Sequence, residues 1–365
     1  MSGRRIAPPA GNERKESAAR MAVRMEINRY DMKSRVPGTK RSFELLADVG
    51  LDEPLTMPVL QVDGVRDGNT LLVLASVHGD EYEGVETALR LFRDLPPEKL
   101  AGTVVLVPAA NPLAYRGGAR VTPEDGLNMA RTFPGNPEGT PTERIAYELH
   151  HRFIARSDFL LDLHSGGTHY AVSALVGYYH DDGSDVGRRS RAAAESFGAP
   201  LLWAHESVAP GRTVSSALAL GVPWLYTEAY GGRRVRRDEA ELFYAGALRL
   251  MRHLGMLEAD DAGKEAGLPP AAAPLRVYGD GNFDGSETAG ADGFFLPSAA
   301  LGTIVRPGDA IGDICGLDGD VRETVRASRE GLLVMIAGTP TVRRGEPLFM
   351  LAETRSGMTP RETAH

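Results

Sequence analysis

The segment LASVHGDEYEG, residues 74–84, places one histidine and three carboxylates within six positions, directly after an apolar run. His78 and Glu81 are of the residue types that bind zinc. Asp80 and Glu83, by contrast, carry charge that would favour the start of a helix. Taken alone, this spacing fits a polar turn as well as it fits half of a metal site.

Residues of the same types follow two other apolar runs. His164 ends the run DFLLDLH, and Glu228 lies within PWLYTEAY. A hydrolytic zinc needs three protein ligands and an open position for water, and two histidines with one glutamate form a recurring set. A general base must then stand beside the water without binding the metal, and Glu228 is the natural candidate. Together these residues indicate metal-assisted hydrolysis.

Asp162 lies two positions before His164 on the same predicted strand, so both side chains point to one face. Its carboxylate could orient the imidazole of a metal-binding histidine. It could equally accept a hydrogen bond from the backbone at the strand end. Both interpretations stay open at this point.

The elements that must position these residues are apolar strands alternating with amphipathic helices. Strands that are apolar throughout indicate a sheet covered by helices on both faces, and hence an α/β domain. Such sheets gather ligands at the carboxyl ends of their strands, which is where the four residues lie. The strand-like runs are residues 70–77, 102–110, 158–164, 200–205 and 223–230. The predicted helices are residues 84–95, 141–155, 186–197, 213–220 and 237–253.

Shifts in composition predict the domain boundaries. The N-terminal residues lack periodicity, with Met21 and Met25 as alternative starts, and a segment rich in alanine, glycine and proline follows Leu257. Short strand-like runs separated by turns then predict a small all-β domain. We therefore expect a disordered leader (1–35), an α/β domain (36–257), a linker (258–274), a β domain (275–355) and a tail (356–365).

Composition excludes several classes of function. The net charge of −8 gives no electrostatic reason to expect nucleic acid or an anionic membrane as a partner. The single cysteine, Cys315, rules out an intrachain disulfide and a cysteine-rich zinc module, which fits a reducing compartment. The chain has no apolar run of bilayer-spanning length and no signal-peptide core. We expect a cytoplasmic protein.

Five motifs, in this order, resemble one enzyme family: HGDEYEG, VPAANP, RVTPEDGLNMARTFPGNP, DLHSGG and TEAYGG. They are similar to the succinylglutamate desuccinylase/aspartoacylase branch of the zinc carboxypeptidase-like hydrolases. Within this branch, the resemblance is closest to bacterial N-acyl amino acid deacylases such as N-acetyl-diaminobutyrate deacetylases. It implies a mixed, mostly parallel sheet with helices on both faces, followed by a small, barrel-sandwich-like β domain.

The resemblance also assigns roles to individual residues. It implies one zinc ion per subunit, bound by His78, Glu81 and His164. Glu228 then deprotonates the zinc-activated water and later passes the proton to the departing amine. The implied reaction is hydrolysis of the amide bond of a small N-acyl amino acid.

Two arginines are assigned by the same resemblance. Arg120 corresponds to an arginine that stabilises the oxyanion, and Arg131 to one that binds a substrate carboxylate. Close relatives have an asparagine before this second arginine, whereas this chain has Ala130. Arg131 can still bind a carboxylate with two hydrogen bonds, and Asn128 is a candidate to replace the lost amide.

Several alternatives share these residues. A metallocarboxypeptidase or an esterase would use the same zinc, water and base. A non-catalytic relative would keep only metal or ligand binding, although the intact set of four residues argues against it. The C-terminal runs also resemble lipoyl carrier domains, but Lys264 is the last lysine, so no lysine follows to carry a cofactor. We expect this domain to cover the active site or to mediate contacts in a homo-oligomer.

The run DGNFDG, residues 280–285, begins like a calcium-binding loop. The position that requires a bidentate glutamate is occupied by Ala291, so calcium binding is not expected. We interpret this run as a polar turn.

Overall fold

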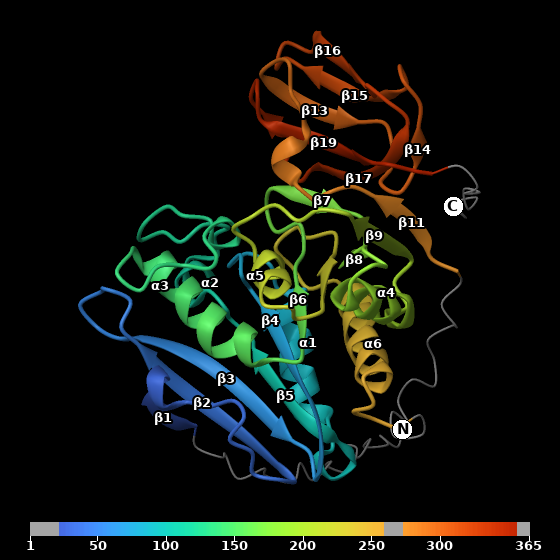
Figure 1. The fold of residues 1–365 in the computed structure, drawn as a ribbon. Coiled ribbons are helices and arrows are strands. Elements are labelled where there is room, and N and C mark those ends of the chain that lie inside the picture. The colour runs from blue at the N-terminus through green and yellow to red at the C-terminus, as the bar shows by residue number, and fades with distance from the viewer. Residues whose placement is uncertain (1–21, 259–272, 356–365) are drawn as a thin grey trace, which may run out of the picture.

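The computed structural model describes residues 22–258 and 273–355. It contains one ten-stranded sheet and two smaller antiparallel sheets near the C-terminus (Figure 1). In spatial order, the large sheet consists of β1 (Val23–Glu26), β2 (Thr39–Ala47), β3 (Leu55–Asp63), β5 (Ala101–Val107), β4 (Arg66–Ala75), β6 (Phe159–Leu163), β10 (Trp224–Glu228), β8 (Leu175–Tyr179), β9 (Leu201–His205) and β11 (Leu275–Tyr278).

The centre of this sheet is parallel. Strands β5, β4, β6 and β10 all run in one direction, whereas β3 runs against both of its neighbours and β8 runs against β10. Strands β5 and β6 are buried along their whole length, as strands covered on both faces must be. The predicted mixed, mostly parallel sheet is confirmed.

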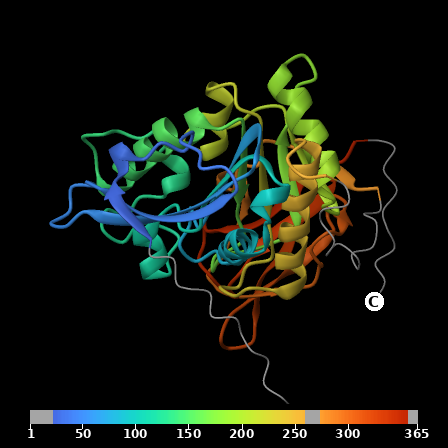
Figure 2. The same ribbon diagram turned by 90° about the horizontal axis from the view of Figure 1, so that it is seen from below.

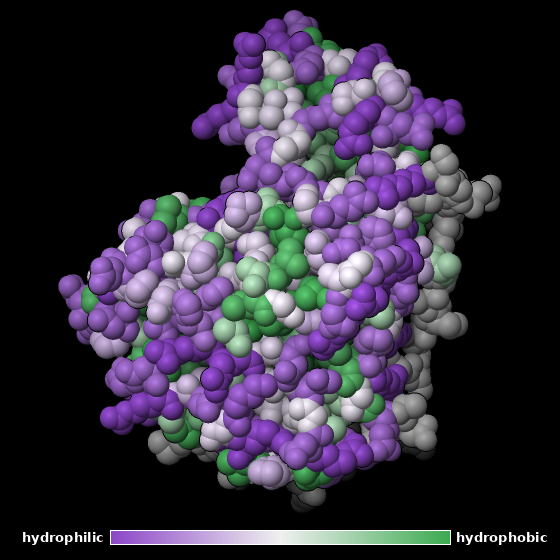
Figure 3. Space-filling model, in the orientation of Figure 1, coloured by the Kyte–Doolittle hydropathy of each residue, from purple (hydrophilic) through white to green (hydrophobic). Residues whose placement is uncertain are grey.

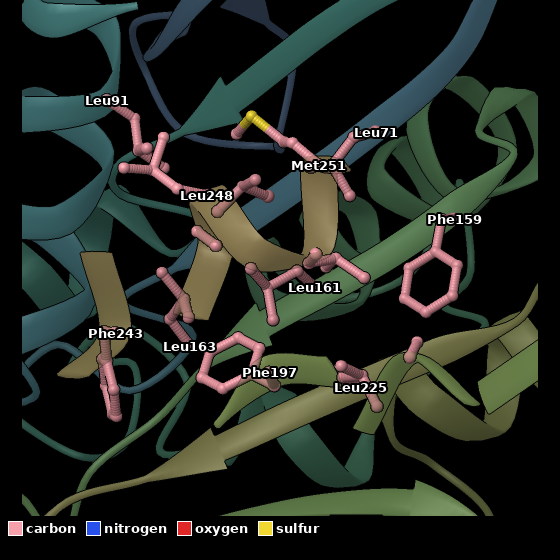
Figure 4. Packing of buried hydrophobic residues seen from close by; sticks show 14 of the residues in the cluster. Leu71, Leu91, Phe159, Leu161, Leu163, Phe197, Leu225, Phe243, Leu248 and Met251 are labelled. Carbon is pink, nitrogen blue, oxygen red and sulfur yellow. The ribbon is translucent and has the colours of Figure 1, made fainter. Parts of the chain in front are cut away.

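Three long helices cover one face of the sheet: α1 (Glu83–Asp94), α4 (Asp185–Phe197) and α6 (Arg237–His253). Figure 2 shows α1 and α6 lying side by side. Every second residue of β6, Phe159, Leu161 and Leu163, packs into the core beneath these helices (Figure 4). Phe197 and Phe243 fill the same core from the helical side. The period of two along the strand is what directs these side chains to one face.

Shorter helices cover the opposite face: α2 (Pro112–Gly117), α3 (Pro141–Glu148) and α5 (Thr213–Ala219). Helix α3 begins with a capping box, in which the Thr140 hydroxyl accepts from the Glu143 backbone and the Glu143 carboxylate accepts from the Thr140 backbone. The predicted helix 141–155 continues irregularly, as a π-helical turn η4 (Leu149–Phe153) and a 3-10 turn η5 (Ile154–Arg156). Further 3-10 turns are η1 (Ile27–Arg29), η2 (Pro97–Lys99), η3 (Met129–Arg131) and η6 (Phe283–Gly285).

The C-terminal unit packs two sheets around its own core, with Phe295, Ile314 and Leu333 at the centre. One sheet contains β12 (Glu287–Thr288), β19 (Pro347–Ala352), β17 (Gly331–Ala337) and β14 (Ile304–Val305), with β7 (Tyr170–Val172) also paired to β17. The other contains β16 (Val321–Arg326), β15 (Ala310–Cys315), β13 (Gly293–Pro297) and β18 (Thr341–Val342). The predicted all-β C-terminal region is confirmed.

Two of the predicted boundaries differ from the structure. Residues 22–35 are not a disordered leader, because β1 pairs with β2 and the side chains of Tyr30 and Met32 are buried. The β domain does not begin at residue 275, because β11 pairs with β9 at the edge of the large sheet. The rest of the predicted leader with Met21, most of the predicted linker and the tail lie outside the described residues.

The C-terminal unit stands above the edge of the large sheet where β4, β6 and β10 end (Figure 1). The space-filling view shows that the surface is notched where this unit meets the α/β body (Figure 3). None of the described helices is both long and apolar enough to span a lipid bilayer.

Candidate active site and metal centre

Three adjacent parallel strands carry the predicted site residues to one place. In the register of the sheet, Leu163 of β6 lies between Ala75 of β4 and Thr227 of β10. His164 follows Leu163 directly, and Glu228 is the last residue of β10. The carboxyl ends of the three strands therefore bring these side chains to one edge of the sheet.

The loop after β4 folds back sharply to present its histidine and glutamate. Ser76 adopts a left-handed conformation with φ of 53°, which is uncommon for a residue with a side chain. A Cβ atom at Gly79 would lie 2.0 Å from the backbone carbonyl of Ala114. Only glycine allows this close approach, and the approach fixes the loop between His78 and Glu81.

His78, Glu81 and His164 are brought together, as predicted. The His78 Nδ1 lies 2.7 Å from Glu81 Oε1, and the His164 Nδ1 lies 3.0 Å from Glu81 Oε2. One ligand atom from each of the three residues lies within 4.8 Å of the other two. His78 and Glu81 are buried, with Glu81 only 2% exposed, and the side chain of His164 is 11% exposed. The donor set is the two-histidine, one-glutamate combination of catalytic zinc sites.

The outer nitrogen of each histidine also has a hydrogen-bond acceptor. His164 Nε2 donates to Asp162 Oδ2 at 2.9 Å, and the Thr213 hydroxyl donates to the same oxygen. His78 Nε2 donates to Asn128 Oδ1 at 3.1 Å. A proton on each Nε2 leaves both Nδ1 lone pairs pointing at the common centre, which is the arrangement that a metal ion requires. The residues present therefore fit a zinc ion.

Electrostatics at this cluster favour a cation. Burial would raise the pKa of the Glu81 carboxyl, but the two histidines that face it hold this pKa below its usual value. Burial opposes charge on His164, yet Asp162 and Glu81 raise the pKa of its imidazole well above the ordinary value. Burial and the charge of Arg120 lower the pKa of His78, so the two imidazoles of the cluster differ, and the negative charge that faces a cation comes from Glu81 and Asp162.

Asp80 and Glu83 are not part of the cluster. The Asp80 carboxylate accepts a hydrogen bond from the Thr168 backbone at 2.7 Å, so it ties the loop after β4 to the loop after β6. Glu83 is the first residue of α1. Glu83 thus lies at the helix start, as predicted, and Asp80 lies three residues before it, outside the candidate metal cluster.

Glu228 lines a pocket whose wall also includes His78, His164 and Asp162. Its side chain is 8% exposed, and its Oε2 has no hydrogen-bond partner among the described residues. Burial, reinforced by the charge of Glu81, raises the pKa of Glu228 to about 8. A carboxyl with a pKa near neutrality can both accept and return a proton.

Arg120 reaches the same pocket from the loop after α2. Its Nη1 lies 3.4 Å from Glu81 Oε1, and its guanidinium lies 5.1 Å from the centre of the Tyr170 ring. The side chain is 15% exposed. A fixed guanidinium beside the candidate metal ligands can stabilise negative charge that develops on a substrate oxygen.

Arg131 also lines the pocket, but it already has a carboxylate partner. Its Nε donates to Asp284 Oδ2 at 2.8 Å and its Nη2 donates to Asp284 Oδ1 at 2.9 Å. Asn128, the other predicted substrate-binding residue, holds His78 and accepts from the Ala130 backbone. Both predicted substrate residues therefore lie at the site, each with a contact that the sequence did not indicate.

Arg212 is a pocket residue that sequence reasoning missed. It precedes α5, and its Nη2 donates to the Asn282 amide oxygen at 2.7 Å. Within residues 22–258 and 273–355, no carboxylate lies within ion-pair distance of Arg212. Burial and the nearby charge of Arg131 lower its pKa. One sequence signal could have pointed to Arg212: it directly precedes the predicted helix 213–220, whose start faces the carboxyl ends of the strands.

The pocket encloses about 620 Å³ including its solvent-open mouth. His205 and Tyr226 form part of its wall. The segment after β11 also contributes, as one of the two roles expected for the C-terminal region requires: Asp280, Gly281 and Phe283 line the pocket, although sequence reasoning did not single out these residues. The pocket is therefore shared between the α/β body and residues that follow β11.

Comparison with known proteins identifies the family. The sequence profile of the succinylglutamate desuccinylase/aspartoacylase catalytic domain matches residues 67–254, which is more than half of the chain. The chain belongs to the succinylglutamate desuccinylase/aspartoacylase family. The resemblance noted from the motifs is thus confirmed, and the matched residues contain all four members of the predicted zinc and base set.

Individual members of the family are similar over most of this chain. N-alpha-acetyl-L-2,4-diaminobutyric acid deacetylase of Halomonas elongata is 29% identical over 295 residues, which cover 79% of this chain and 83% of that protein. A succinylglutamate desuccinylase/aspartoacylase structure from Rhodobacter sphaeroides is 27% identical, with a TM-score of 0.77, and the match covers 87% of this chain and 96% of the other.

A product-bound structure of the ectoine utilization protein EutE (DoeB) from Ruegeria pomeroyi is 25% identical, with a TM-score of 0.75. The match covers 86% of this chain and 94% of that chain. The similarity to these family members therefore includes the C-terminal unit as well as the catalytic domain. This chain is a homologue of an amide-hydrolysing deacetylase.

Proposed function

We propose that this protein is a zinc-dependent hydrolase that cleaves the amide bond of a small N-acyl amino acid. The observation that carries the proposal is the convergence of His78, Glu81 and His164, with Glu228 in the same pocket and without a hydrogen-bond partner for its Oε2 among the described residues. The family to which the chain belongs and its deacetylase relative support the same reaction.

The proposed mechanism assigns one task to each residue. When bound by His78, Glu81 and His164, zinc would supply a Lewis acid that polarises the acyl carbonyl and acidifies a water molecule. Glu228 accepts the proton of the attacking water and returns it to the departing amine nitrogen. Arg120 faces the acyl oxygen and stabilises the negative charge that develops there.

We propose that Arg212, with Arg131 beside it, binds the carboxylate of the substrate. Arg212 is partly buried and donates only to an amide oxygen in the described structure, so its remaining hydrogen-bond donors can meet an anion. A guanidinium is well suited to bind a carboxylate through two parallel hydrogen bonds. Asn128 takes the different role of orienting His78.

Metallocarboxypeptidase and esterase activity would use the same groups. The pocket wall contributed by Gly281 and Phe283 narrows the space above the strand ends, which favours small substrates over peptides. A non-catalytic relative would retain the metal ligands alone. It would have no use for a buried carboxyl such as Glu228, with its raised pKa.

The experiment that tests the proposal measures metal content and hydrolysis on the same preparation. The purified protein should contain about one zinc ion per chain, and it should hydrolyse at least one member of a panel of N-acetyl, N-succinyl and N-formyl amino acids. Peptides and esters complete the panel. Zinc without hydrolysis of any compound would favour a binding protein, and cleavage of peptides or esters alone would favour the alternative enzymes.

A further inference from the structure

The segment from Gly279 to Gly285, which we call the roof segment, is tied to the residue that precedes helix α5. The Asn282 side-chain oxygen accepts a hydrogen bond from Arg212 Nη2 at 2.7 Å. The backbone of Arg212 is held as well, because its N–H donates to the Ser215 hydroxyl at 2.9 Å and its carbonyl accepts from that hydroxyl at 2.7 Å. Thr213, the first residue of α5, therefore follows a residue that is fixed from two sides.

Thr213 connects this fixed position to a candidate metal ligand. Its side chain is buried, and its hydroxyl donates to Asp162 Oδ2. The same oxygen accepts a hydrogen bond from His164 Nε2 at 2.9 Å. The other oxygen of Asp162, Oδ1, is buried and has no hydrogen-bond partner among the described residues. Within that part of the chain, the orientation of this carboxylate thus depends on Thr213 and His164 together.

The orientation of Asp162 matters because His164 lies between two carboxylates. Its Nδ1 is 3.0 Å from Glu81 Oε2, and its Nε2 is 2.9 Å from Asp162 Oδ2. A neutral imidazole that binds a metal through one nitrogen carries its proton on the other. The proton is held on Nε2 only while an acceptor stays in line with it. The terminal torsion of an aspartate is broad, so a carboxylate without a second contact would lose this alignment.

A hydroxyl is well suited to hold this carboxylate. It donates one hydrogen bond and carries no charge, whereas a lysine or an arginine would also neutralise the carboxylate. The ion pair that the structure gives to Asp162 is the one with His164. Thr213 therefore fixes the oxygen and leaves its negative charge to act on the imidazole.

A second buried threonine makes the same contact away from the site. Thr103 of β5 donates to Asp63 Oδ1 at 3.0 Å, and both residues are buried. Asp63 accepts from three further donors among the described residues, two side chains and one backbone N–H. Its orientation therefore does not depend on Thr103, whereas Asp162 has no such additional donors in the described structure.

We propose that Thr213 is a positioning residue for the metal centre: it aligns Asp162, and through Asp162 it keeps the Nδ1 lone pair of His164 directed at the common centre of the three ligands. This inference rests on the proposed function, in which His164 binds zinc. It also connects the roof segment to the metal centre, because that segment holds Arg212 and Thr213 is the next residue.

The test measures zinc affinity by competition with a chelator of known affinity. Thr213→Val keeps the shape of the side chain but removes the hydroxyl, so zinc should bind about tenfold more weakly than to the wild-type protein. Thr213→Ser retains the hydroxyl and should restore most of the affinity. Thr213→Ala also lacks the hydroxyl, and it should show the same loss if the valine variant does not fold.

Thr103→Val is the matched control, because it removes a buried hydroxyl from another buried carboxylate. It should lower the free energy of unfolding and leave zinc affinity unchanged. If both valine variants weaken zinc binding equally, the cause is a general loss of stability and the inference is wrong. Wild-type zinc affinity in Thr213→Val would also overturn it.

Cobalt(II) adds a readout of the coordination geometry. The visible absorption of the cobalt-loaded protein depends on how the ligands surround the ion. The bands of Thr213→Val should therefore differ from those of the wild-type protein, and the bands of Thr213→Ser and Thr103→Val should coincide with them. Identical spectra in all four proteins would contradict the role of Thr213 and leave the proposed zinc site intact. A wild-type protein that binds neither zinc nor cobalt would contradict the proposed function and this inference together.

Discussion

Arg131 of the α/β body and Asp284 of the roof segment form a two-hydrogen-bond ion pair, at 2.8 and 2.9 Å. The pair joins residues 153 positions apart in the sequence. One partner lines the pocket, and the other approaches it from beyond β11. The position of a candidate substrate-binding arginine thus depends on the C-terminal region.

Asp284→Asn tests this dependence. The pair is partly exposed, with side-chain exposures of 30% and 59%, so we expect its loss to reduce the free energy of unfolding by less than about 1 kcal/mol. KM for an N-acyl amino acid should rise by up to about tenfold, with a smaller change in kcat, because Arg131 loses its fixed position. Chemical denaturation and steady-state kinetics measure the two effects. An unchanged KM would show that Arg131 needs no such support.

Glu228→Gln should reduce kcat by at least about 100-fold, because the amide cannot accept the proton of the attacking water. Zinc content should stay the same, since Glu228 lies outside the ligand set. Steady-state rates and metal analysis of the same sample provide the measurement. Glu241→Gln is the control and should retain wild-type turnover, because Glu241 of α6 pairs with Arg90 of α1 and does not line the pocket. Full activity of the Glu228 variant would remove it from the role of base.

Asn128→Leu should weaken zinc binding by about 10- to 100-fold, because His78 Nε2 loses its hydrogen-bond acceptor. Asn128→Asp keeps an acceptor oxygen at the same place and should restore most of the affinity. Titration against a chelator of known zinc affinity distinguishes the two variants. Equal affinities in both variants would mean that Asn128 does not orient the imidazole.

The stability of the metal-free protein should fall in mild acid, partly because of His205. This imidazole is 2% exposed, and burial lowers its pKa to about 4 from 6.5. The contribution of the neutral imidazole to the free energy of unfolding is therefore fully present above pH 6.5. It is lost as the pH falls from 6.5 towards 4. Over that window the loss is on the order of 3 kcal/mol.

Thermal denaturation from pH 7.5 to pH 4.5, after removal of metal with a chelator, measures this effect. The wild-type protein is compared with the His205→Gln variant. The variant carries no group that titrates in this window at position 205, so its Tm should fall less steeply as the pH is lowered. Parallel curves for the two proteins would assign the acid sensitivity to other groups.

The sequence predicted the parts of this structure that depend on local patterns. His164 and Glu228 could be placed because each ends an apolar strand, and the strands adjoin in a parallel sheet. The pairing of β1 with β2 could not be predicted, because the Val23–Glu26 segment alternates apolar and charged residues over only four positions and is mostly exposed.

Asp280 shows the limit of local reasoning within the site itself. The run 280–285 was interpreted as a polar turn, and locally it is one, with a side-chain cap from Asn282 and a single 3-10 turn. Its position over the pocket depends on contacts with His205 and Tyr170, more than 70 residues away. Periodicity in the sequence cannot predict such contacts between residues far apart in the chain. Arg212 was missed for the same reason.

The α/β body and the C-terminal unit are joined by backbone pairing at two places. Strand β7 of the body extends the C-terminal sheet beside β17, and Tyr278, the last residue of β11, pairs with Glu353 after β19. Swinging the two units apart as rigid bodies would break backbone hydrogen bonds at both places at once. Substrate must therefore enter through side-chain and loop adjustments at the pocket mouth, and the C-terminal unit acts as a fixed wall of the enzyme rather than as a hinged door.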